Sequence, residues 1–220
     1  MRAFIFANGQ MKCLPKKIEP FKSEDLIIAA DGGLRFCIQE NIVPHLIVGD
    51  LDSVDTKQLA EMQRLGSKVI QYPVNKDATD LELSIKSALS EGAKEIILLS
   101  ALGARWDMTF SNVLMMTSDF LDNAHVRILD DNQEMFCIKG YGQVELIHRK
   151  GTNLSLLPLS LSVEGITLQG MKYSLNNECL NMGSSRGLSN VIVDQYASIR
   201  IQNGVLLVFC EDKSNEIYRL

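Results

Sequence analysis

Two acidic residues one position apart, Asp50 and Asp52, directly follow a short apolar run, 46–48. Side chains alternate between the two faces of extended backbone, so the spacing predicts that both carboxylates point the same way. Two carboxylates that point together can bind one hard cation. The alternative is a turn that caps the following helix, with Ser53 or Asp55 as the N-cap residue.

The segment 76–82 contains a second group of acids, at a predicted helix start. Thr79 and Glu82 have the spacing of a capping box, which predicts a helix that begins at Asp80. Asp77 and Asp80 then lie near the positive end of the helix dipole, which favours their ionised form. If these acids face the preceding pair, the pocket is strongly negative and a divalent cation stabilises it; otherwise the acids are solvated and separate.

Two further segments carry residues suited to phosphate groups. Asp31, Gly32 and Gly33 end another apolar run. Adjacent glycines let backbone N–H groups at a helix start approach a phosphate, and a tight turn explains the pattern equally well. Arg105 precedes Asp107 in a glycine-containing loop, and the planar guanidinium of arginine matches phosphate oxygens. The alternative is an ion pair between Arg105 and Asp107 that holds the loop closed.

Together, these acids, the arginine and the glycine turn indicate metal-assisted transfer from a nucleoside triphosphate. In such reactions Mg²⁺ bridges phosphate oxygens, a cationic side chain stabilises developing charge, and the protein mainly supplies position. The sequence lacks the Gly-x4-Gly-Lys-Ser/Thr pattern, which excludes a P-loop enzyme. Histidine-based catalysis and a zinc site have little support, because the sequence has three scattered histidines, His45, His125 and His148.

Short apolar runs alternate with helical patterns over the first part of the chain. The predicted strands are 3–7, 26–30, 46–48, 68–72, 95–99 and 126–129. The predicted helices are 33–40, 55–65, 80–91 and 107–121. This alternation predicts an α/β, Rossmann-like domain with a mostly parallel sheet. Ligands of such sheets bind outside the carboxyl ends of the strands, and the acids described above are expected at that edge.

The remainder of the chain changes to short alternating segments broken by glycine and asparagine. The predicted strands are 143–148, 153–159, 166–171, 188–193, 198–202 and 205–211. Asn203 and Gly204 are a hairpin signal between the last two strands. This pattern predicts a smaller all-β sandwich or barrel domain. The boundary is expected within 132–142, which gives domains 1–133 and 134–220, and residues 212–220 are expected to form a polar tail.

Composition excludes several classes of protein. The chain has 220 residues, of which 46% are hydrophobic, and a formal net charge of −5 with scattered lysine and arginine, which argues against a nucleic-acid partner. No apolar run has membrane-spanning length, so no membrane association is expected. The five cysteines are far apart and form no C-x-x-C pair, which favours reduced thiols and a cytoplasmic location.

The motifs also resemble, in order, those of the thiamin pyrophosphokinase (thiamine diphosphokinase) family. The matching segments span almost the whole chain and are 30–33, 44–53, 76–82, 103–107 with Asn112, 170–175 and 187–190. The resemblance implies a nucleotide-binding catalytic α/β domain followed by a β-sandwich domain that binds thiamine and mediates dimerisation. It also implies a homodimer with the thiamine site at the subunit interface.

The reaction implied by the resemblance moves the pyrophosphoryl group of ATP to the hydroxyethyl oxygen of thiamine, giving thiamine diphosphate and AMP, with Mg²⁺ as cofactor. The implied catalytic residues are Asp50, Asp52, Asp80, Arg105 and Asp107, with either Asp80 or Asp107 accepting the alcohol proton. The implied metal ligands are Asp50, Asp52 and Asp80. The implied ATP and phosphate contacts are Asp31, Gly32, Lys76, Asp77, Thr79 and Arg105. The implied thiamine contacts are Asp80, Tyr173, Ser189 and Asn190.

The chain departs from the family pattern at three positions. Met108 stands where many members have histidine, Leu51 where many have an aromatic residue, and Tyr173 where many have tryptophan. Methionine cannot hydrogen-bond as histidine does, whereas Leu51 keeps an apolar packing role and Tyr173 keeps an aromatic surface. Two alternative functions stay open: the same chemistry on another primary alcohol such as a pterin, and a catalytically silent module that binds thiamine or nucleotide.

Overall fold

The computed structural model describes residues 1–103 and 105–212. Ala104, in the predicted phosphate-binding loop, and residues 213–220, in the predicted polar tail, lie outside the described residues. The chain divides into two compact units, Met1–Asp131 and Asn132–Leu220, here called unit 1 and unit 2.

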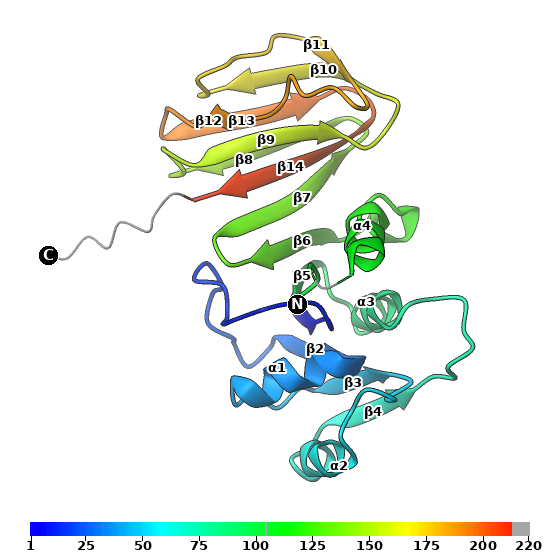
Figure 1. The fold of residues 1–220 in the computed structure, drawn as a ribbon. Coiled ribbons are helices and arrows are strands. Elements are labelled where there is room, and N and C mark those ends of the chain that lie inside the picture. The colour runs from blue at the N-terminus through cyan, green and yellow to red at the C-terminus, as the bar shows by residue number, and fades with distance from the viewer. Residues whose placement is uncertain (104, 213–220) are drawn as a thin grey trace, which may run out of the picture. The chain divides into compact units, whose positions relative to one another are not determined.

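Unit 1 is built on a parallel sheet (Figure 1). Its strands are β1 (Arg2–Phe6), β2 (Leu26–Ala30), β3 (Leu46–Gly49), β4 (Lys68–Gln71), β5 (Glu95–Leu99) and β6 (His125–Asp130). They lie in the order β6-β5-β1-β2-β3-β4, and each neighbouring pair is parallel. The predicted parallel sheet is confirmed. Because parallel strands share one carboxyl edge, the loops after β1, β2, β3 and β5 meet there.

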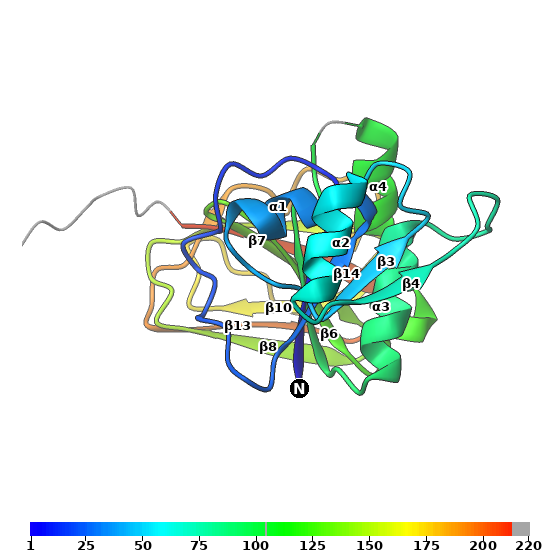
Figure 2. The same cartoon turned by 90° about the horizontal axis from the view of Figure 1, so that it is seen from below.

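Helices cover both faces of this sheet. They are α1 (Leu34–Gln39), α2 (Thr56–Arg64), α3 (Asp80–Ser90) and α4 (Trp106–Met115), with 3-10 turns η1 (Asp31–Gly33) and η2 (Asp119–Leu121). Figures 1 and 2 show α1 and α2 on one face and α3 on the other. Phe4 and Phe6 of β1 are buried in one cluster with Leu34 of α1 and Met62 of α2. Burying such a side chain stabilises a fold by about 1.5–3 kcal/mol, which makes the sheet a rigid platform.

The starts of α2 and α3 follow the predicted capping residues. Asp55 is the N-cap of α2 and accepts hydrogen bonds from two backbone N–H groups at 2.9 and 3.0 Å. Thr79 is the N-cap of α3, and its Oγ1 accepts a bond from the N–H of Glu82 at 3.2 Å. A side-chain cap of this kind stabilises a helix by about 1 kcal/mol. The predicted start of α3 at Asp80 is therefore confirmed.

The predicted helix 107–121 is wrong in its length. α4 ends at Met115, and Ser118 adopts extended backbone, with φ −65° and ψ 139°, before the short turn η2. The hydroxyl of Thr117 donates to the carbonyl of Leu114 at 2.8 Å. Threonine and serine hydroxyls compete for backbone groups in this way, so the helix stops although its apolar pattern continues.

Unit 2 is a sandwich of two antiparallel sheets. Its strands are β7 (Gln133–Lys139), β8 (Gly142–Ile147), β9 (Asn153–Pro158), β10 (Ser162–Gln169), β11 (Glu178–Asn181), β12 (Asn190–Val191), β13 (Tyr196–Ile201) and β14 (Val205–Glu211). One layer has the order β12-β9-β14-β7 and the other β11-β10-β13-β8. Val163, Ile199 and Leu206 are fully buried in the core of the unit. The predicted all-β sandwich is confirmed.

Two strands of unit 2 were not expected from the sequence. β7 lies within 132–142, where a boundary was predicted, and β11 lies in a segment predicted to contain no strand. β7 contains Glu134, whose side chain is buried and paired with Arg149 at 2.6 Å. A buried carboxylate breaks the apolar alternation by which strands are identified, so β7 resembles a linker in the sequence.

The pair Asn203 and Gly204 does not form the predicted hairpin. β13 pairs with β8 and β10, whereas β14 pairs with β7 and β9, so the two residues connect one sheet to the other. Gly204 has φ +98°, and a Cβ there would lie 2.5 Å from the carbonyl oxygen of Ser162. Glycine is required at this corner because of the close packing, and the same signal in sequence is typical of a hairpin turn.

Two expectations from composition concern membranes and disulfides. In the described ranges, every helix is too short or too polar to cross a membrane. Among the described residues, which include all five cysteines, no disulfide forms. Cys37 is buried in the core of unit 1, and burial raises the pKa of its thiol to about 12. This thiol therefore stays protonated near neutral pH.

A buried ion pair fastens the start of β1. Arg2 donates to both carboxylate oxygens of Asp25, from Nε at 3.0 Å and from Nη2 at 2.7 Å, and the backbone N–H of Lys22 donates to the same carboxylate at 2.7 Å. Asp25 is 3% exposed. The hydrogen bond from Arg2 is the main cause that lowers the pKa of Asp25 below its ordinary value, against burial, which raises it.

The first prediction is that Arg2→Met destabilises the protein by about 3 kcal/mol at neutral pH, because it leaves a buried carboxylate without its cation. A lowered folded-state pKa contributes stability above the ordinary carboxyl pKa, and this contribution is lost as the pH falls through the folded-state value. Urea unfolding of both proteins at several pH values should therefore show a deficit that shrinks on acidification. Arg127→Met, which breaks a half-exposed pair with Glu95, is the control and should cost less than about 1 kcal/mol. Equal losses in the two variants would contradict the prediction.

Candidate functional site

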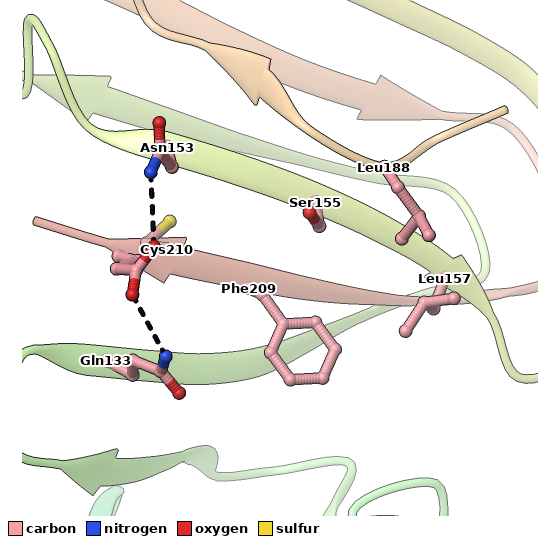
Figure 3. Close-up of a pocket in the computed structure, with 8 residues that line it drawn as sticks. Gln133, Asn153, Ser155, Leu157, Leu188, Phe209 and Cys210 are labelled. Atoms are coloured by element: carbon pink, nitrogen blue, oxygen red, sulfur yellow. Dashed lines mark hydrogen bonds between the residues drawn. The ribbon is translucent and has the colours of Figure 1, made fainter. Parts of the chain in front are cut away.

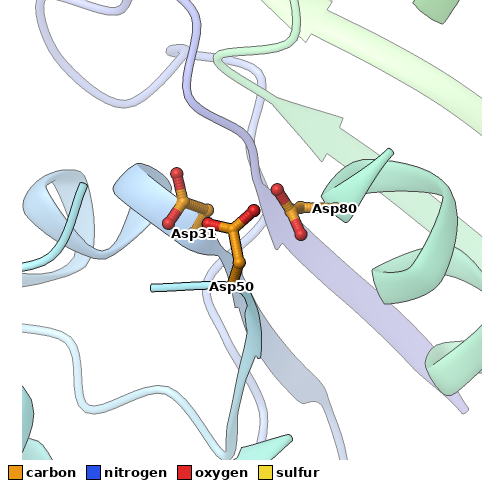
Figure 4. A group of neighbouring side chains, drawn as sticks. All are labelled: Asp31, Asp50 and Asp80. Atoms are coloured by element: carbon orange, nitrogen blue, oxygen red, sulfur yellow. The ribbon is translucent and has the colours of Figure 1, made fainter. Parts of the chain in front are cut away.

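Three carboxylates meet at the carboxyl edge of the parallel sheet. Asp31 follows β2, Asp50 follows β3, and Asp80 begins α3. One oxygen from each lies within 4.8 Å of the others. In the view of Figure 4, the carboxylate of Asp50 lies between those of Asp31 and Asp80. These residues, here called the acid cluster, come from segments far apart in the sequence, and strand order brings them together.

The backbone permits this close approach. A Cβ at Gly49, the last residue of β3, would lie 3.0 Å from the Cβ of Asp31 and 3.2 Å from Oδ1 of Asp80. Asp31 itself has φ +45°, a left-handed conformation that aspartate adopts more readily than most residues. Residues held in such conformations cost about 1–3 kcal/mol and gather at functional sites.

Asp31 is the most buried member of the acid cluster. The residue is 7% exposed, and its Oδ1 is buried without a hydrogen bond from any described residue. Burial is the main cause that raises the pKa of Asp31 above its ordinary value, and the nearby Asp80 and Asp50 add to it. The Gly32 N–H and the Ser53 hydroxyl act in the opposite direction. An ionised Asp31 therefore lacks a compensating positive charge.

Lys76 supplies a positive charge to the other two members. Its Nζ lies 3.0 Å from Oδ2 of Asp50 and 2.7 Å from Oδ1 of Asp80. The hydrogen bond from Lys76 is the main cause that lowers the pKa of Asp50. Burial opposes the charge on Lys76, but the bonds to Asp80 and Asp50 outweigh it and raise the pKa of the ammonium. The acid cluster and this lysine thus carry a formal charge of −2 when all four groups are ionised.

The acid cluster fits a hard divalent cation. Mg²⁺ prefers carboxylate oxygens, and here three converge from rigid elements. The buried Oδ1 of Asp31 is a hydrogen-bond acceptor, and a possible metal ligand, without a partner among the described residues; a buried polar atom of this kind is costly unless a partner binds it. Even with Lys76 in place, the site keeps a formal charge of −2, which favours the binding of a divalent cation.

Extended backbone does not continue from Asp50 to Asp52. Leu51 between them has φ +66°, which ends the extended backbone of β3, so the alternation from which a shared direction was predicted does not hold there. Asp52 is exposed, and its backbone N–H donates to Oδ1 of Asp50 at 3.3 Å. Leu51 packs against the core of unit 1, as expected. Asp31 occupies the third place in the acid cluster, and a metal-binding role for Asp52 stays a prediction.

A cavity of about 340 Å³ adjoins the acid cluster. Its walls include Asp31 and Asp80 together with Asn8, Arg105 and Met108. The sequence indicated Asp31, Asp80 and Arg105, but it gave no role to Asn8. The only available signal for Asn8 was its position after the first strand, next to a glycine.

Arg105 and Asp107 form the ion pair that the sequence offered as an alternative. Nη2 of Arg105 lies 2.5 Å from Oδ2 of Asp107, and both side chains are exposed, at 71% and 64%. The hydrogen bond from Arg105 is the main cause that lowers the pKa of Asp107.

Thr79 lines the same cavity as Arg105, whereas Asp77 is exposed and lies outside the acid cluster.

The glycines after β2 have a packing role. A Cβ at Gly33 would lie 2.0 Å from the carbonyl oxygen of Phe6, and one at Gly32 would lie 2.5 Å from the side-chain amide of Asn8. A side chain at position 33 would push η1 away from the backbone of β1, and one at position 32 would displace the side chain of Asn8. The tight turn that the sequence offered as an alternative is thus present, and phosphate contact at Gly32 stays a prediction.

In unit 2, Asn190 holds Tyr173 in place. The amide oxygen of Asn190 accepts a bond from the backbone N–H of Tyr173 at 3.0 Å, and its amide nitrogen donates to the carbonyl of Tyr173 at 2.7 Å. Asn190 is 5% exposed, whereas the side chain of Tyr173 projects into solvent at 57% exposed. The buried amide therefore orients the backbone that presents an aromatic ring.

Unit 2 also has a hollow of about 280 Å³ on the sheet that contains β7, β9 and β14 (Figure 3). Leu188 lines it beside Ser155, whose hydroxyl accepts a bond from the backbone N–H of Ser189 at 3.1 Å. At the other end, Gln133 and Asn153 donate to the carboxylate of Glu211 at 3.2 and 3.1 Å. The exposed Ser189 thus lies at the rim of a partly apolar hollow.

Comparisons with known proteins agree with this architecture. A protein from Bacillus subtilis (strain 168) named thiamine pyrophosphokinase is 25% identical over 205 residues, which cover 93% of this chain and 95% of that protein. The crystal structure of a thiamin pyrophosphokinase family protein from Enterococcus faecalis aligns with TM-score 0.85 at 24% identity, covering 96% of this chain and 99% of that one. The crystal structure of thiamine pyrophosphokinase from Bacillus subtilis aligns with TM-score 0.82 at 24% identity, with the same coverage. These alignments confirm the fold.

Two family domains match the chain in sequence. Residues 19–128 match the domain described as thiamin pyrophosphokinase, catalytic domain, and include the whole acid cluster. Residues 143–206 match the domain described as thiamin pyrophosphokinase, vitamin B1 binding domain, and include Tyr173, Ser189 and Asn190. The first match covers half of the 220 residues, so this chain belongs to the thiamin pyrophosphokinase family.

Proposed function

We propose that this protein is a thiamine diphosphokinase that transfers the pyrophosphoryl group of ATP to thiamine, with residues 1–133 as the nucleotide-binding catalytic domain and 134–220 as the thiamine-binding domain. The observation that carries the proposal is the acid cluster, with its unsatisfied buried oxygen, beside a cavity that Arg105 lines. Such a site suits metal-assisted phosphoryl chemistry, in which position and electrostatics supply most of the catalysis. The match of residues 143–206 to a vitamin B1 binding domain supports thiamine as the acceptor.

Asp31, Asp50 and Asp80 would hold Mg²⁺, and Asp52 would join them when the nucleotide is bound. When bound, the ion supplies charge neutralisation on the phosphate oxygens. Asp52 lies next to Asp50 on an exposed turn and is positioned to reach a ligand that extends from the acid cluster into solvent. The loop at 76–80 would contact the phosphates, with Lys76 as its cation and Asp77 and Thr79 beside it.

In the transfer, the hydroxyl oxygen of thiamine forms a bond to the β-phosphorus of ATP, and the bond from that phosphorus to the oxygen of the α-phosphate breaks. AMP leaves with the electron pair of that bond. Arg105 would neutralise charge on the transferred group, and the turn at Gly32 would contact the phosphates. Asp80 or Asp107 would accept the alcohol proton.

Thiamine would bind against Tyr173 and Ser189. The thiazolium ring of thiamine carries a positive charge, and a cation is attracted to the face of an aromatic ring. Asn190 would act by holding Tyr173, because both ends of its amide are already bonded to the backbone of that residue. Met108 gives the cavity of unit 1 a polarizable, apolar wall where many relatives place histidine.

We also propose a homodimer with the thiamine site at its interface, in the cytoplasm. Three large apolar side chains recur every four residues along α4: Trp106 is 78% exposed, Phe110 61% and Leu114 52%. Residues at this spacing form one stripe on a helix, and a contiguous exposed apolar stripe marks a site of association. A hollow of about 540 Å³ lies beside it, lined by Phe110, Leu114 and Phe120. The absence of disulfides among the described residues supports a reducing compartment.

The second prediction is the reaction itself. Purified protein incubated with ATP, MgCl₂ and thiamine should give thiamine diphosphate and AMP in equal amounts, measured by chromatography. ADP with thiamine monophosphate would keep the site but overturn the reaction. Binding of thiamine without product would indicate a catalytically silent module, and transfer of the pyrophosphoryl group to a pterin in preference to thiamine would indicate the other alternative.

The third prediction separates the acid cluster from Asp52. In titration calorimetry without nucleotide, Asp31→Asn should weaken Mg²⁺ binding by about tenfold or more, because a carboxylate ligand is lost. Asp52→Asn should bind Mg²⁺ as the unchanged protein does, yet its turnover should fall by about 100-fold or more. If Mg²⁺ binding is weakened in Asp52→Asn but unchanged in Asp31→Asn, the third metal ligand is Asp52 and not Asp31.

The fourth prediction concerns the stripe on α4. Phe110→Asp should convert a dimer to a monomer in sedimentation velocity and should reduce turnover with thiamine, because a charge on an apolar contact opposes association. Val74→Asp changes another exposed apolar residue, 69% exposed and away from α4, and is the control that should remain dimeric. A Phe110→Asp protein that remains dimeric would exclude the α4 stripe as the contact.

A further inference from the structure

Within the described ranges, Lys76 forms ion pairs with two members of the acid cluster, Asp50 and Asp80. Its Nζ lies between Oδ2 of Asp50, at 3.0 Å, and Oδ1 of Asp80, at 2.7 Å. The side chains involved are largely buried, with 13% of Lys76, 14% of Asp50 and 24% of Asp80 exposed. An ammonium held in this way is shielded from water and has little freedom to screen other groups.

The position of Nζ conflicts with a metal ion on the same oxygens. Mg²⁺ binds carboxylate oxygens at about 2.0–2.1 Å, closer than the ammonium lies to either oxygen. Both cations would then lie within a few ångströms of each other, where like charges repel strongly because the surroundings are largely buried. One of them must leave, and the side chain of lysine has four rotatable bonds with which to do so.

Asp31 explains why the site binds a divalent cation in preference to the ammonium of Lys76. Lys76 bonds to Asp50 and Asp80, whereas Oδ1 of Asp31 stays buried without a hydrogen bond from the described residues. A single ammonium therefore satisfies the acid cluster only in part. A divalent ion that binds all three carboxylates leaves the acid cluster with a formal charge of −1, where the bound ammonium leaves −2, and it gives the carboxylate of Asp31 a positive partner.

We propose that Lys76 is the resident counter-ion of the metal-free site, and that a divalent cation displaces its ammonium from Asp50 and Asp80. This inference rests on the proposed function in one respect, namely that the cation is Mg²⁺. Lys76 keeps the carboxylates together while the site is empty of metal. Once displaced, its ammonium lies at the start of α3 and is available to a phosphate group. Lys76 is thus a positioning residue before it becomes a phosphate contact.

The test is Mg²⁺ binding to Lys76→Met in the absence of nucleotide. Calorimetric titration with MgCl₂ should give at least about tenfold tighter binding than in the unchanged protein, because the competing ammonium is gone. Thermal melting should show a lower midpoint for Lys76→Met without Mg²⁺ and a larger rise on its addition. Turnover should nevertheless fall, so tighter metal binding and slower catalysis occur in one variant.

Lys86→Met is the matched control. Lys86 also pairs with an acid four residues away on α3, Glu82 at 2.7 Å, but its side chain is 50% exposed and its ion-pair partner lies outside the acid cluster. This variant should bind Mg²⁺ as the unchanged protein does. If Lys76→Met does not fold, carbon-13 NMR of ε-labelled lysine in the unchanged protein replaces it, with Lys76→Arg for assignment. The Lys76 signal should move to the position of solvated lysines as MgCl₂ is added.

Each outcome decides the inference separately from the proposed function. Equal or weaker Mg²⁺ binding in Lys76→Met, or a Lys76 signal that does not respond to MgCl₂, overturns the displacement even if thiamine diphosphate is formed. Failure of both proteins to bind Mg²⁺ overturns the displacement together with the metal site. Tighter binding in Lys76→Met without any thiamine diphosphate from the unchanged protein supports the displacement and overturns the reaction.

Discussion

Repulsion among three carboxylates is the constraint on which the site of unit 1 depends. Asp31, Asp50 and Asp80 approach within 4.8 Å of one another at the edge of a buried sheet, where water screens charge poorly. Left alone, such groups separate or take up protons. The fold prevents separation because two of them follow strands whose side chains are buried on both faces, and the third begins a capped helix. The three carboxylates therefore stay close together, and relief of their repulsion favours the binding of a cation.

The packing of unit 1 keeps the three carboxylates close together. β1, β2 and β3 have buried apolar residues throughout their central positions, so moving any strand end means disturbing the core. Gly49 removes the one side chain that would keep Asp31 and Asp80 apart. The N-terminus of α3 adds a favourable partial charge near Asp80, typically about 0.3–1 kcal/mol near a helix end. Packing energy thus supports an arrangement that electrostatics alone opposes.

Much of this could be predicted from the sequence because it follows from periodicity and capping. Alternation of strands and helices gave the parallel sheet, and Thr79 with Glu82 gave the start of α3 and hence the place of Asp80. The grouping of Asp31, rather than Asp52, with Asp50 and Asp80 could not be predicted from spacing, and a metal-binding role for Asp52 stays a prediction. The grouping depends on the left-handed conformation of Leu51, a residue type that rarely adopts it, and on a tertiary contact across Gly49. Likewise, β7 could not be predicted because the buried Glu134 breaks its apolar alternation. Gly204 lies in the connection between the two sheets, although the pair Asn203-Gly204 is typical of a hairpin turn.

The two cations of the site differ in the strength with which the protein holds them. Arg105 and Asp107 form an exposed pair, and such pairs contribute about 0–1 kcal/mol, so a phosphate can replace the carboxylate at little cost. Lys76 bonds to two largely buried acids, and removing it leaves their negative charges without a cation. Arg105 is therefore available to any anion that enters the cavity, whereas Lys76 becomes available only when another cation takes over its carboxylates. Because a metal–nucleotide complex brings both charges at once, it satisfies both conditions, which free phosphate or free metal does not.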